Sequence, residues 1–325
     1  MAYNKIVTPE KWAKVNKENK LIMEDYITEC RAQKKKESTI FQYTNDLKIL
    51  MVYILENCGN KTITELGRKD FRRLMLWMSD DLESSSARCN RLMSCCRSLL
   101  TYLENDDDTD YDKNQARSIK GLEKDPVREI VFLDADTCDK LYQYFMDREM
   151  YRDALLFALG LESSARKGEL AQVKKDSITD DGNATSEVVG KRGKRFKLIY
   201  FDWTKEAAKK YFAQRGEDDV EELFVSKNGT ALSKAAIYDM VISWRPILKE
   251  ITGKDIPINV HSLRHTALQL YSTGEHEVCR SRGMGPIPIN QLKNIARHSD
   301  LTTTQGYLMS DVEGELENTF GIKLD

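Results

Sequence analysis

Apolar residues recur at helical spacing in several blocks of residues 21–103. Polar or glycine-containing breaks separate the blocks, at residues 34–38, 58–60 and 84–86. This pattern predicts four or more helices packed as a small bundle, with Ser38 and Thr64 as candidate N-caps. The methionines and aromatic residues of the blocks are more typical of a packed core than of a cofactor site.

A polar and acidic stretch follows the last block. Residues 104–112 are nearly free of aliphatic side chains, and polar sequence continues to Pro126. Such composition is typical of a linker between domains. We therefore expect an N-terminal extension at 1–17, a helical-bundle domain at 18–104, a linker at 105–130 and a second domain at 131–325.

The second domain begins a new hydrophobic pattern near Val131. Residues 151–161 are predicted to form a buried helix, and residues 163–178 a turn followed by an amphipathic helix. The pattern then predicts two short strands joined as a hairpin, with a basic loop at its tip, at residues 186–189, 196–201 and 190–195. Helices resume at Lys205, so the expected fold class is mainly α with a small antiparallel β-sheet.

Length and composition limit the class of protein further. The chain has 325 residues, of which 41% are hydrophobic and 31% charged, which suits two folded domains and excludes a disordered or fibrous chain. Residues 1–100 carry 18 lysines and arginines against 13 acidic residues, although the net charge of the whole chain is -2. This excess favours a module that meets a polyanion, although a solvated surface would explain it as well.

The cysteines and the apolar segments exclude other classes. Seven cysteines are scattered without a CxxC pair, which argues against a zinc site and against a disulfide framework. No apolar run approaches the ~20 residues that a membrane-spanning helix needs. We therefore expect a protein of a reducing cytoplasm with no membrane role.

The segment HSLRHT at residues 261–266 is the first candidate for chemistry. On a helix, His261, Arg264 and His265 share one face, so that imidazole and guanidinium groups converge on one anion. His261 and His265 also have the spacing of a zinc pair. The glutamate of a zinc-binding HExxH motif is absent, however, and Arg264 would place a cation beside the metal.

Two further segments add to this set. ARHSDLTTTQGYL at residues 296–308 contains His298 and Tyr307, and SSARKGEL places Arg166 at the start of a predicted helix. A lone tyrosine among 14 would be weak evidence for a nucleophile. The presence of two arginines and two histidines in the same set makes Tyr307 a stronger candidate for the nucleophile.

Together these segments resemble the tyrosine recombinase, or phage integrase, family. The resemblance covers nearly the whole chain: residues 18–104 are similar to a core-site DNA-binding domain, and residues 131–325 to the catalytic domain. It implies a set of six catalytic residues, with Tyr307 as the nucleophile. They are Arg166, Lys191, His261, Arg264, His298 and Tyr307.

The sequence departs from the family pattern at three places. An extra residue in the basic loop leaves Lys194 as the alternative to Lys191 for the hairpin lysine. Ala296 and Arg297 stand where the family usually has Leu-Gly, a change that we expect to alter only local packing. Residues 275–288 look like an insertion.

The resemblance implies a site-specific DNA recombinase that cleaves and rejoins strands through a 3′-phosphotyrosyl intermediate, without a metal or other cofactor. Its expected partners are double-stranded DNA, three further copies of the chain joined through the C-terminal tail as a homotetramer, and accessory DNA-bending proteins. Integration or excision of a mobile element and resolution of DNA multimers both fit. A type IB topoisomerase and a catalytically inactive DNA-binding regulator are the alternatives.

Overall fold

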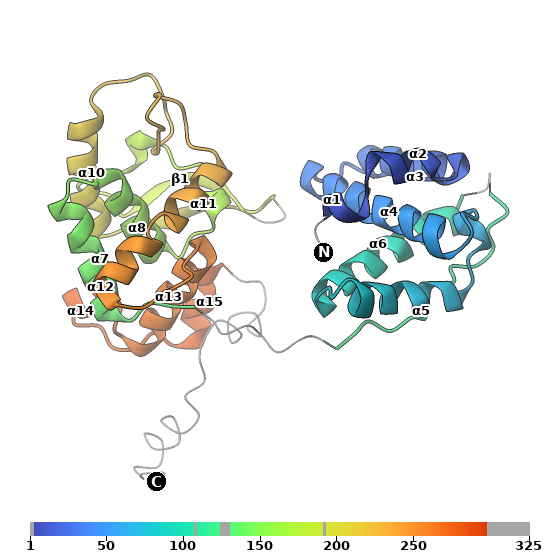
Figure 1. The fold of residues 1–325 in the computed structure, drawn as a ribbon. Coiled ribbons are helices and arrows are strands. Elements are labelled where there is room, and N and C mark those ends of the chain that lie inside the picture. Colours follow the sequence, from blue (N-terminus) through green and yellow to red (C-terminus); the bar gives the residue numbers. More distant parts are fainter. Residues whose placement is uncertain (1–2, 107–108, 124–130, 191–192, 298–325) are drawn as a thin grey trace, which may run out of the picture. The chain divides into compact units, whose positions relative to one another are not determined.

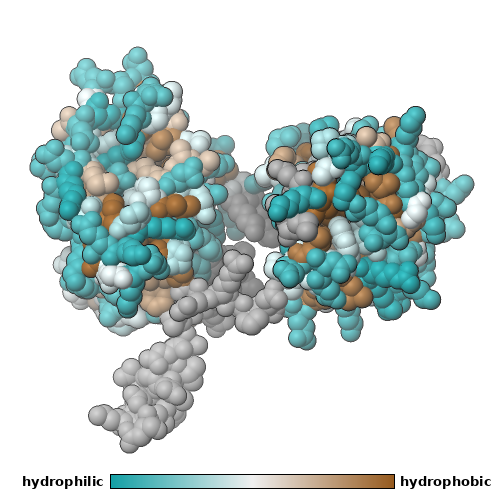
Figure 2. Space-filling view, in the orientation of Figure 1, coloured by the Kyte–Doolittle hydropathy of each residue, from teal (hydrophilic) through white to brown (hydrophobic). Residues whose placement is uncertain are grey.

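The computed structural model describes residues 3–106, 109–123, 131–190 and 193–297 (Figure 1). The chain divides into two compact units, Met1–Arg128 and Glu129–Asp325. Hydrophilic residues cover most of the visible surface of each unit (Figure 2). Within the described residues, no helix has the length and apolar character needed to cross a membrane.

The first unit is a helical bundle around its own core. Leu47, Leu50 and Leu99 are fully buried where α3, α4 and α6 meet. Its elements are α1 (Tyr3–Ile6), α2 (Pro9–Lys14), α3 (Lys17–Ala32), α4 (Glu37–Asn57), the 3-10 helix η1 (Ile63–Glu65), α5 (Arg68–Leu76), the π-helical segment η2 (Trp77–Asp81) and α6 (Ser86–Glu104).

Both predicted N-caps in this bundle are wrong. Lys36 is the N-cap of α4, so Ser38 lies inside the first turn of the helix. Thr64 lies within η1, whose backbone is held from α3, because the Asn19 side chain accepts a hydrogen bond from the Ile63 N–H at 2.8 Å. A local signal contributes as well, because the Glu65 carboxylate accepts from the Thr62 N–H at 2.8 Å in a capping box.

Part of the predicted linker packs on the bundle. In the described segment 109–123, the Asn114 side chain donates to the Arg97 carbonyl at 2.9 Å. The Asn90 side chain pairs with both main-chain groups of Leu122, at 2.8 and 2.9 Å. Segment 109–123, which we call the strap, therefore belongs to the first unit and is not a free spacer.

The second unit is built around α8, which is buried along most of its length and packs on α7, α10 and α13. Trp244 is fully buried in the same core, and its indole N–H donates to Asp153 at 2.7 Å. The elements are α7 (Ala135–Asp147), α8 (Tyr151–Ser163), α9 (Lys167–Leu170), η3 (Lys175–Ser177), β1 (Ala184–Val189), β2 (Arg195–Ile199), α10 (Asp202–Arg215), α11 (Lys234–Ile242), α12 (Arg245–Thr252), α13 (Val260–Thr273), α14 (Glu277–Ser281) and α15 (Ile289–Ala296).

The predicted hairpin is confirmed. β1 and β2 pair antiparallel, with Val188 opposite Phe196 and Val189 opposite Arg195. The mainly α class with a small antiparallel sheet is therefore correct.

The turn predicted at the start of residues 163–178 is present, with Ser164 in the left-handed region, but the amphipathic helix expected after it is short, because α9 has only four residues. Just beyond it, the Gln172 side chain accepts from the Val189 N–H at 2.9 Å and donates to the Val189 carbonyl at 3.1 Å. Because Gln172 pairs with the hairpin, the chain leaves the helical conformation after α9 instead of continuing as a longer helix.

Helix α10 begins at Asp202, three residues before the predicted start. The buried carboxylate of Glu162, on α8, accepts from the N–H groups of Phe201 and Thr204 at 2.6 and 3.2 Å. An anion from another helix thus satisfies the free donors at the N-terminus of α10.

The first half of segment 275–288 is part of the core rather than an external insertion. His276 is fully buried, lies 3.2 Å from the Leu161 carbonyl through Nε2, and stacks on Tyr271 with ring centroids 3.7 Å apart. Cys279 on α14 is also fully buried.

The seven cysteines, all within the described residues, form no disulfide and lie mostly inside the protein. Six of the seven are buried, and Cys58 is half-buried. They fill space in both cores as small apolar side chains do.

Candidate active site

Arg166 lies in the tight turn between α8 and α9. Its backbone N–H and its Nη1 donate to the two carboxylate oxygens of Glu169, at 2.9 and 3.1 Å. The Glu169 side chain is 2% exposed, whereas that of Arg166 is 33% exposed. A buried carboxylate thus holds a guanidinium whose surface remains accessible.

Arg264 reaches the same turn from α13. It is 1% exposed, its Nη1 donates to the Ser164 carbonyl at 2.5 Å, and its Nη2 donates to the Ala296 carbonyl. Ser164 has the left-handed backbone of a helix C-cap, with φ of 47°. Burial of a guanidinium is unfavourable unless its donors are satisfied, so these carbonyls fix its position.

His261 completes the described cluster. Asn259 caps α13, which spans the predicted helix 260–273, by accepting from the His261 N–H at 2.8 Å. Partial desolvation of the ring, followed by the positive charges of Arg264 and Arg166, lowers the pKa of His261 below its usual value. The imidazole is therefore predominantly neutral near pH 7 and able to accept a proton.

The histidine pair offers no sign of a metal centre. The rings of His261 and His265 meet edge to face, with centroids 4.6 Å apart. Within the described part of the chain, no group of three or more His, Cys, Asp and Glu side chains is placed to hold a metal ion.

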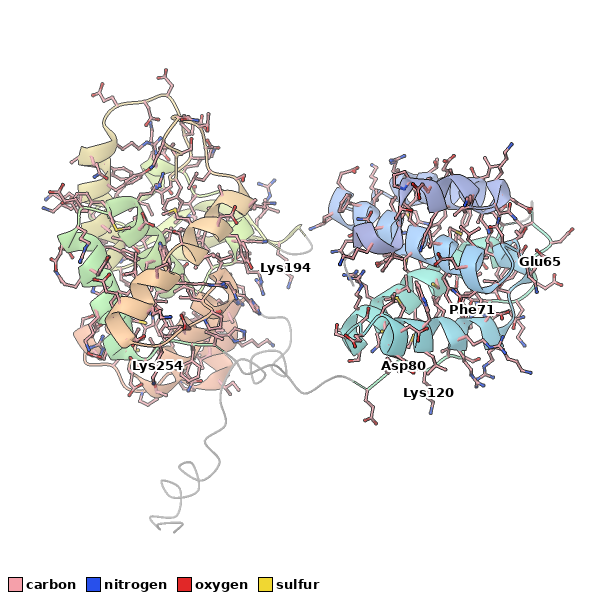
Figure 3. The ribbon with its side chains drawn as sticks, in the orientation of Figure 1. Glu65, Phe71, Asp80, Lys120, Lys194 and Lys254 are labelled. Carbon is pink, nitrogen blue, oxygen red and sulfur yellow. The ribbon has the colours of Figure 1, made fainter. Side chains whose placement is uncertain are left out.

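The start of the hairpin's tip lies beside these residues. A methyl group placed on Gly190 would come within 3.5 Å of the Glu169 carboxylate and 2.5 Å of the Phe196 ring. The Gly190 N–H donates to the Lys194 carbonyl at 2.8 Å, and the Lys194 side chain is exposed on the hairpin (Figure 3). The structure thus brings Arg166, His261 and Arg264 together, whereas Lys191, His298 and Tyr307 lie outside the described residues.

Two residues of this cluster were not predicted from the sequence. Glu169 accepts hydrogen bonds from Arg166 and also from Arg297 Nη2 at 3.3 Å. The spacing Arg-x-x-Glu is the available signal for Glu169, since a residue three positions into a helix can reach back to its N-cap. For Arg297, the signal is its position directly before His298.

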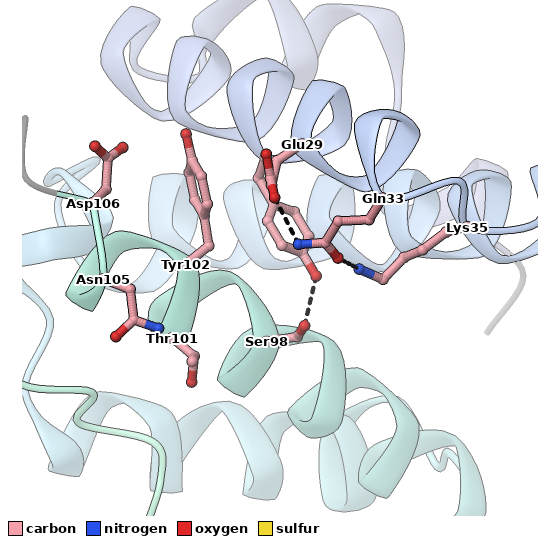
Figure 4. Close-up of a pocket in the computed structure, with 9 residues that line it drawn as sticks. Glu29, Gln33, Lys35, Ser98, Thr101, Tyr102, Asn105 and Asp106 are labelled. Atoms are coloured by element: carbon pink, nitrogen blue, oxygen red, sulfur yellow. Dashed lines mark hydrogen bonds between the residues drawn. The ribbon is translucent and has the colours of Figure 1, made fainter.

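The first unit carries two grooves of different character. One, of about 730 Å³, lies between α3 and α6, and two of its hydrogen bonds join lining residues, Gln33 to Glu29 at 2.6 Å and Tyr26 to Ser98 at 2.7 Å (Figure 4). The other, of about 500 Å³, is basic. Its lining residues are Arg68, Arg72, Met75, Leu76, Ser118, Ile119, Lys120 and Leu122.

Comparison with known proteins gives the class. The profile of the phage integrase family matches residues 131–313, more than half of the chain. The protein belongs to this family, whose members are tyrosine recombinases, and it is a DNA strand transferase of site-specific recombination. This match favours the recombinase over the topoisomerase and the inactive regulator. No curated protein matches the chain.

Solved structures share the fold at low sequence identity. A lambda integrase dimer bound to a COC′ core site is 16% identical with a TM-score of 0.65, covering 87% of this chain and 95% of that one. A Tn1549 transposon integrase in complex with a circular intermediate DNA is 15% identical with a TM-score of 0.67, covering 91% and 99%. The XerH site-specific recombinase bound to a palindromic difH substrate is 17% identical with a TM-score of 0.65, covering 87% and 79%.

Proposed function

We propose that Arg166, Arg264 and His261 activate a DNA phosphodiester for attack by Tyr307. The observation that supports this proposal is the meeting of two arginines and a histidine of lowered pKa at the turn between α8 and α9. The residues come from segments about a hundred positions apart. Together they place two positive charges and a proton acceptor where an anionic phosphate could bind.

The two guanidinium groups stabilise the transition state. Charge increases on the non-bridging oxygens as the phosphorus is attacked, and forked N–H donors match their geometry. By analogy with oxyanion-hole donors, each such group contributes ~3 kcal/mol. His298 adds a further donor to the same phosphate.

The proton transfers follow from the chemistry of the reacting groups. Tyr307 gives its proton to His261 as its oxygen bonds to phosphorus, and the bond to the 5′-oxygen breaks. Lys191, or its neighbour Lys194, protonates that oxygen. One phosphodiester replaces another, so the 3′-phosphotyrosyl intermediate keeps the bond energy and a 5′-hydroxyl reverses the step.

We assign DNA binding to the bundle of residues 18–104 and catalysis to residues 131–325. The basic groove on α5 is better suited to phosphate contacts than the groove between α3 and α6. The working assembly is a homotetramer on paired sites in the cytoplasm, joined by the C-terminal tail and assisted by DNA-bending proteins. The similar solved structures, each of an integrase or recombinase bound to DNA, support the choice of partner.

A covalent-trapping assay tests the proposed function. The protein is mixed in EDTA with labelled, nicked duplexes that tile the DNA flanking its gene, and the products are separated on a denaturing gel. We expect a shifted protein–DNA adduct, because the nick lets the cleaved fragment diffuse away and prevents the reverse reaction.

The control is a second tyrosine of the catalytic unit. Tyr307→Phe should abolish the adduct, whereas Tyr144→Phe, which removes a hydroxyl bonded only to surface Glu250 at 3.2 Å, should retain it. Persistence of the adduct in Tyr307→Phe would show that another residue is the nucleophile. Joined products on intact paired sites would establish strand exchange between partners.

A further inference from the structure

The end of α15 is built around a residue that its backbone does not favour. Arg297 is the C-cap of α15 and has φ of 55°, in the left-handed region that glycine adopts most readily. Arginine accepts backbone strain at this position, so the side chain must supply a compensating interaction.

The Arg297 guanidinium connects three elements of the catalytic unit. It is 13% exposed, its Nη1 donates to the Ser163 carbonyl at 3.0 Å, and its Nη2 donates to the Ser164 carbonyl at 3.1 Å and to Glu169 at 3.3 Å. Its Cζ atom lies over the Phe196 ring on β2, 4.9 Å from the ring centroid. One side chain thus ties the end of α15 to α8, α9 and the hairpin.

Two of the three acceptors that Arg297 uses also accept from the two proposed catalytic arginines. The Ser164 carbonyl also accepts from Arg264, and the Glu169 carboxylate also accepts from Arg166. A change at Arg297 would release both acceptors at once. The expectation that an arginine at this position alters only local packing is therefore wrong.

We propose that Arg297 is a positioning residue for the recombinase reaction, which holds the acceptors of Arg166 and Arg264 in place and fixes the chain directly before His298. This inference rests on the proposed function. Arg297 acts through the other residues and takes no part in the proton transfers.

The test measures adduct formation in single turnover against the concentration of a nicked duplex that the wild-type protein cleaves. Arg297→Gly relieves the backbone strain but removes all three hydrogen bonds. We expect the rate at saturating DNA to fall 10- to 100-fold, with the half-saturating concentration changed less than twofold. Arg297→Lys keeps the charge but lacks the forked guanidinium. Its rate of adduct formation at saturating DNA should lie between those of the wild type and Arg297→Gly.

The matched control is Arg280→Gly, which removes a surface guanidinium paired with Asp139 at 2.5 and 2.8 Å on the same unit. It should react at the wild-type rate. If Arg297→Gly fails to fold, by circular dichroism, Arg297→Lys carries the comparison alone.

The outcomes separate this inference from the proposed function. Arg297→Gly and Arg297→Lys reacting at the wild-type rate would overturn the role of Arg297 and leave Tyr307-dependent cleavage intact. A rise in the half-saturating concentration at unchanged maximal rate would overturn it too, since it would assign the side chain to DNA binding. A wild-type protein that forms no adduct on any duplex would refute the proposed function and, with it, this role.

Discussion

Among the individual side chains of the site, some are held rigidly and others remain accessible to a ligand. Arg264 is 1% exposed and bonded to two main-chain carbonyls, so its position is fixed before any substrate arrives. The Arg166 side chain, at 33% exposed, keeps a surface open to a ligand while Glu169 orients it. Preorganised charge of this kind needs little rearrangement during the reaction.

Arg264→Lys tests this rigidity. A single ammonium cannot reach the Ser164 and Ala296 carbonyls with the geometry of a guanidinium fork, and one buried acceptor loses its donor. We expect adduct formation to slow by at least ~100-fold and the free energy of unfolding in urea to fall by about 1–3 kcal/mol.

Arg280→Lys is the matched control for the same assays. Its guanidinium is at the surface, 44% exposed, where an ion pair contributes about 0–1 kcal/mol. Equal effects of the two substitutions would contradict the assigned role of Arg264.

Among the elements, α8 and α14 each contribute one buried carboxyl group, Glu162 and Glu277. Burial raises the pKa of both groups, and the charge of Glu162 disfavours the charged form of Glu277. Burial, followed by the negative charge of Glu162, raises the pKa of Glu277 to about 9. His276 lies next in the chain, and burial lowers its pKa to about 3.

Glu277→Gln tests the pair through the pH dependence of stability. Because the pKa of Glu277 is raised on folding, its contribution is fully present below about pH 4.5 and is lost as the pH rises towards 9. The free energy of unfolding of Glu277→Gln minus that of the wild type should therefore increase from pH 5 to pH 8.

Titration of His276 opposes this trend in both proteins and cancels in the difference. Glu275→Gln, a change at an exposed carboxylate two residues away, is the control and should differ from the wild type by a constant amount. A difference for Glu277→Gln that is equally flat would contradict the raised pKa of Glu277.

Elements were predictable where the signal was local. The pattern of apolar residues located α8, α13 and the hairpin. A buried helical face, or a turn flanked by β-branched residues, produces a recognisable pattern among residues close together in the sequence. The start of α10 was missed because Glu162, from another helix, determines it. The start of η1 was assigned to Thr64 instead of Thr62, although the spacing Thr62-x-x-Glu65 is a local capping signal. The six site residues were chosen by motif. The bond from Arg166 to Glu169 has a local signal, whereas the bond from Arg297 to the same carboxylate joins residues 128 positions apart and has none.

At the scale of the whole molecule, the strap extends the first unit beyond the boundary predicted from the sequence. Tyr111, Ala116 and Ile119 are buried in the core of that unit, beyond the predicted domain end at residue 104. The sequence analysis placed the end of the domain too early. The few apolar residues of the strap stand among many acidic and polar ones, so the composition of the stretch resembles that of a linker.

A pair of fragments tests the contribution of the strap. Residues 1–123 should unfold in urea as one cooperative transition. Residues 1–104 should be less stable by about 3 kcal/mol or more, because each buried apolar side chain contributes about 1.5–3 kcal/mol. Equal midpoints of unfolding would show that the strap adds nothing to the bundle.

The burial of the cysteines has a consequence for reactivity towards oxidants and alkylating reagents. The thiolate is the reactive form of a cysteine, and burial raises the pKa of Cys96 to about 12 and those of Cys95 and Cys138 well above the usual value. These three thiols therefore react slowly while the protein stays folded. A single cysteine introduced at an exposed position would be modified selectively, so that a probe can report on one chosen point of the recombinase.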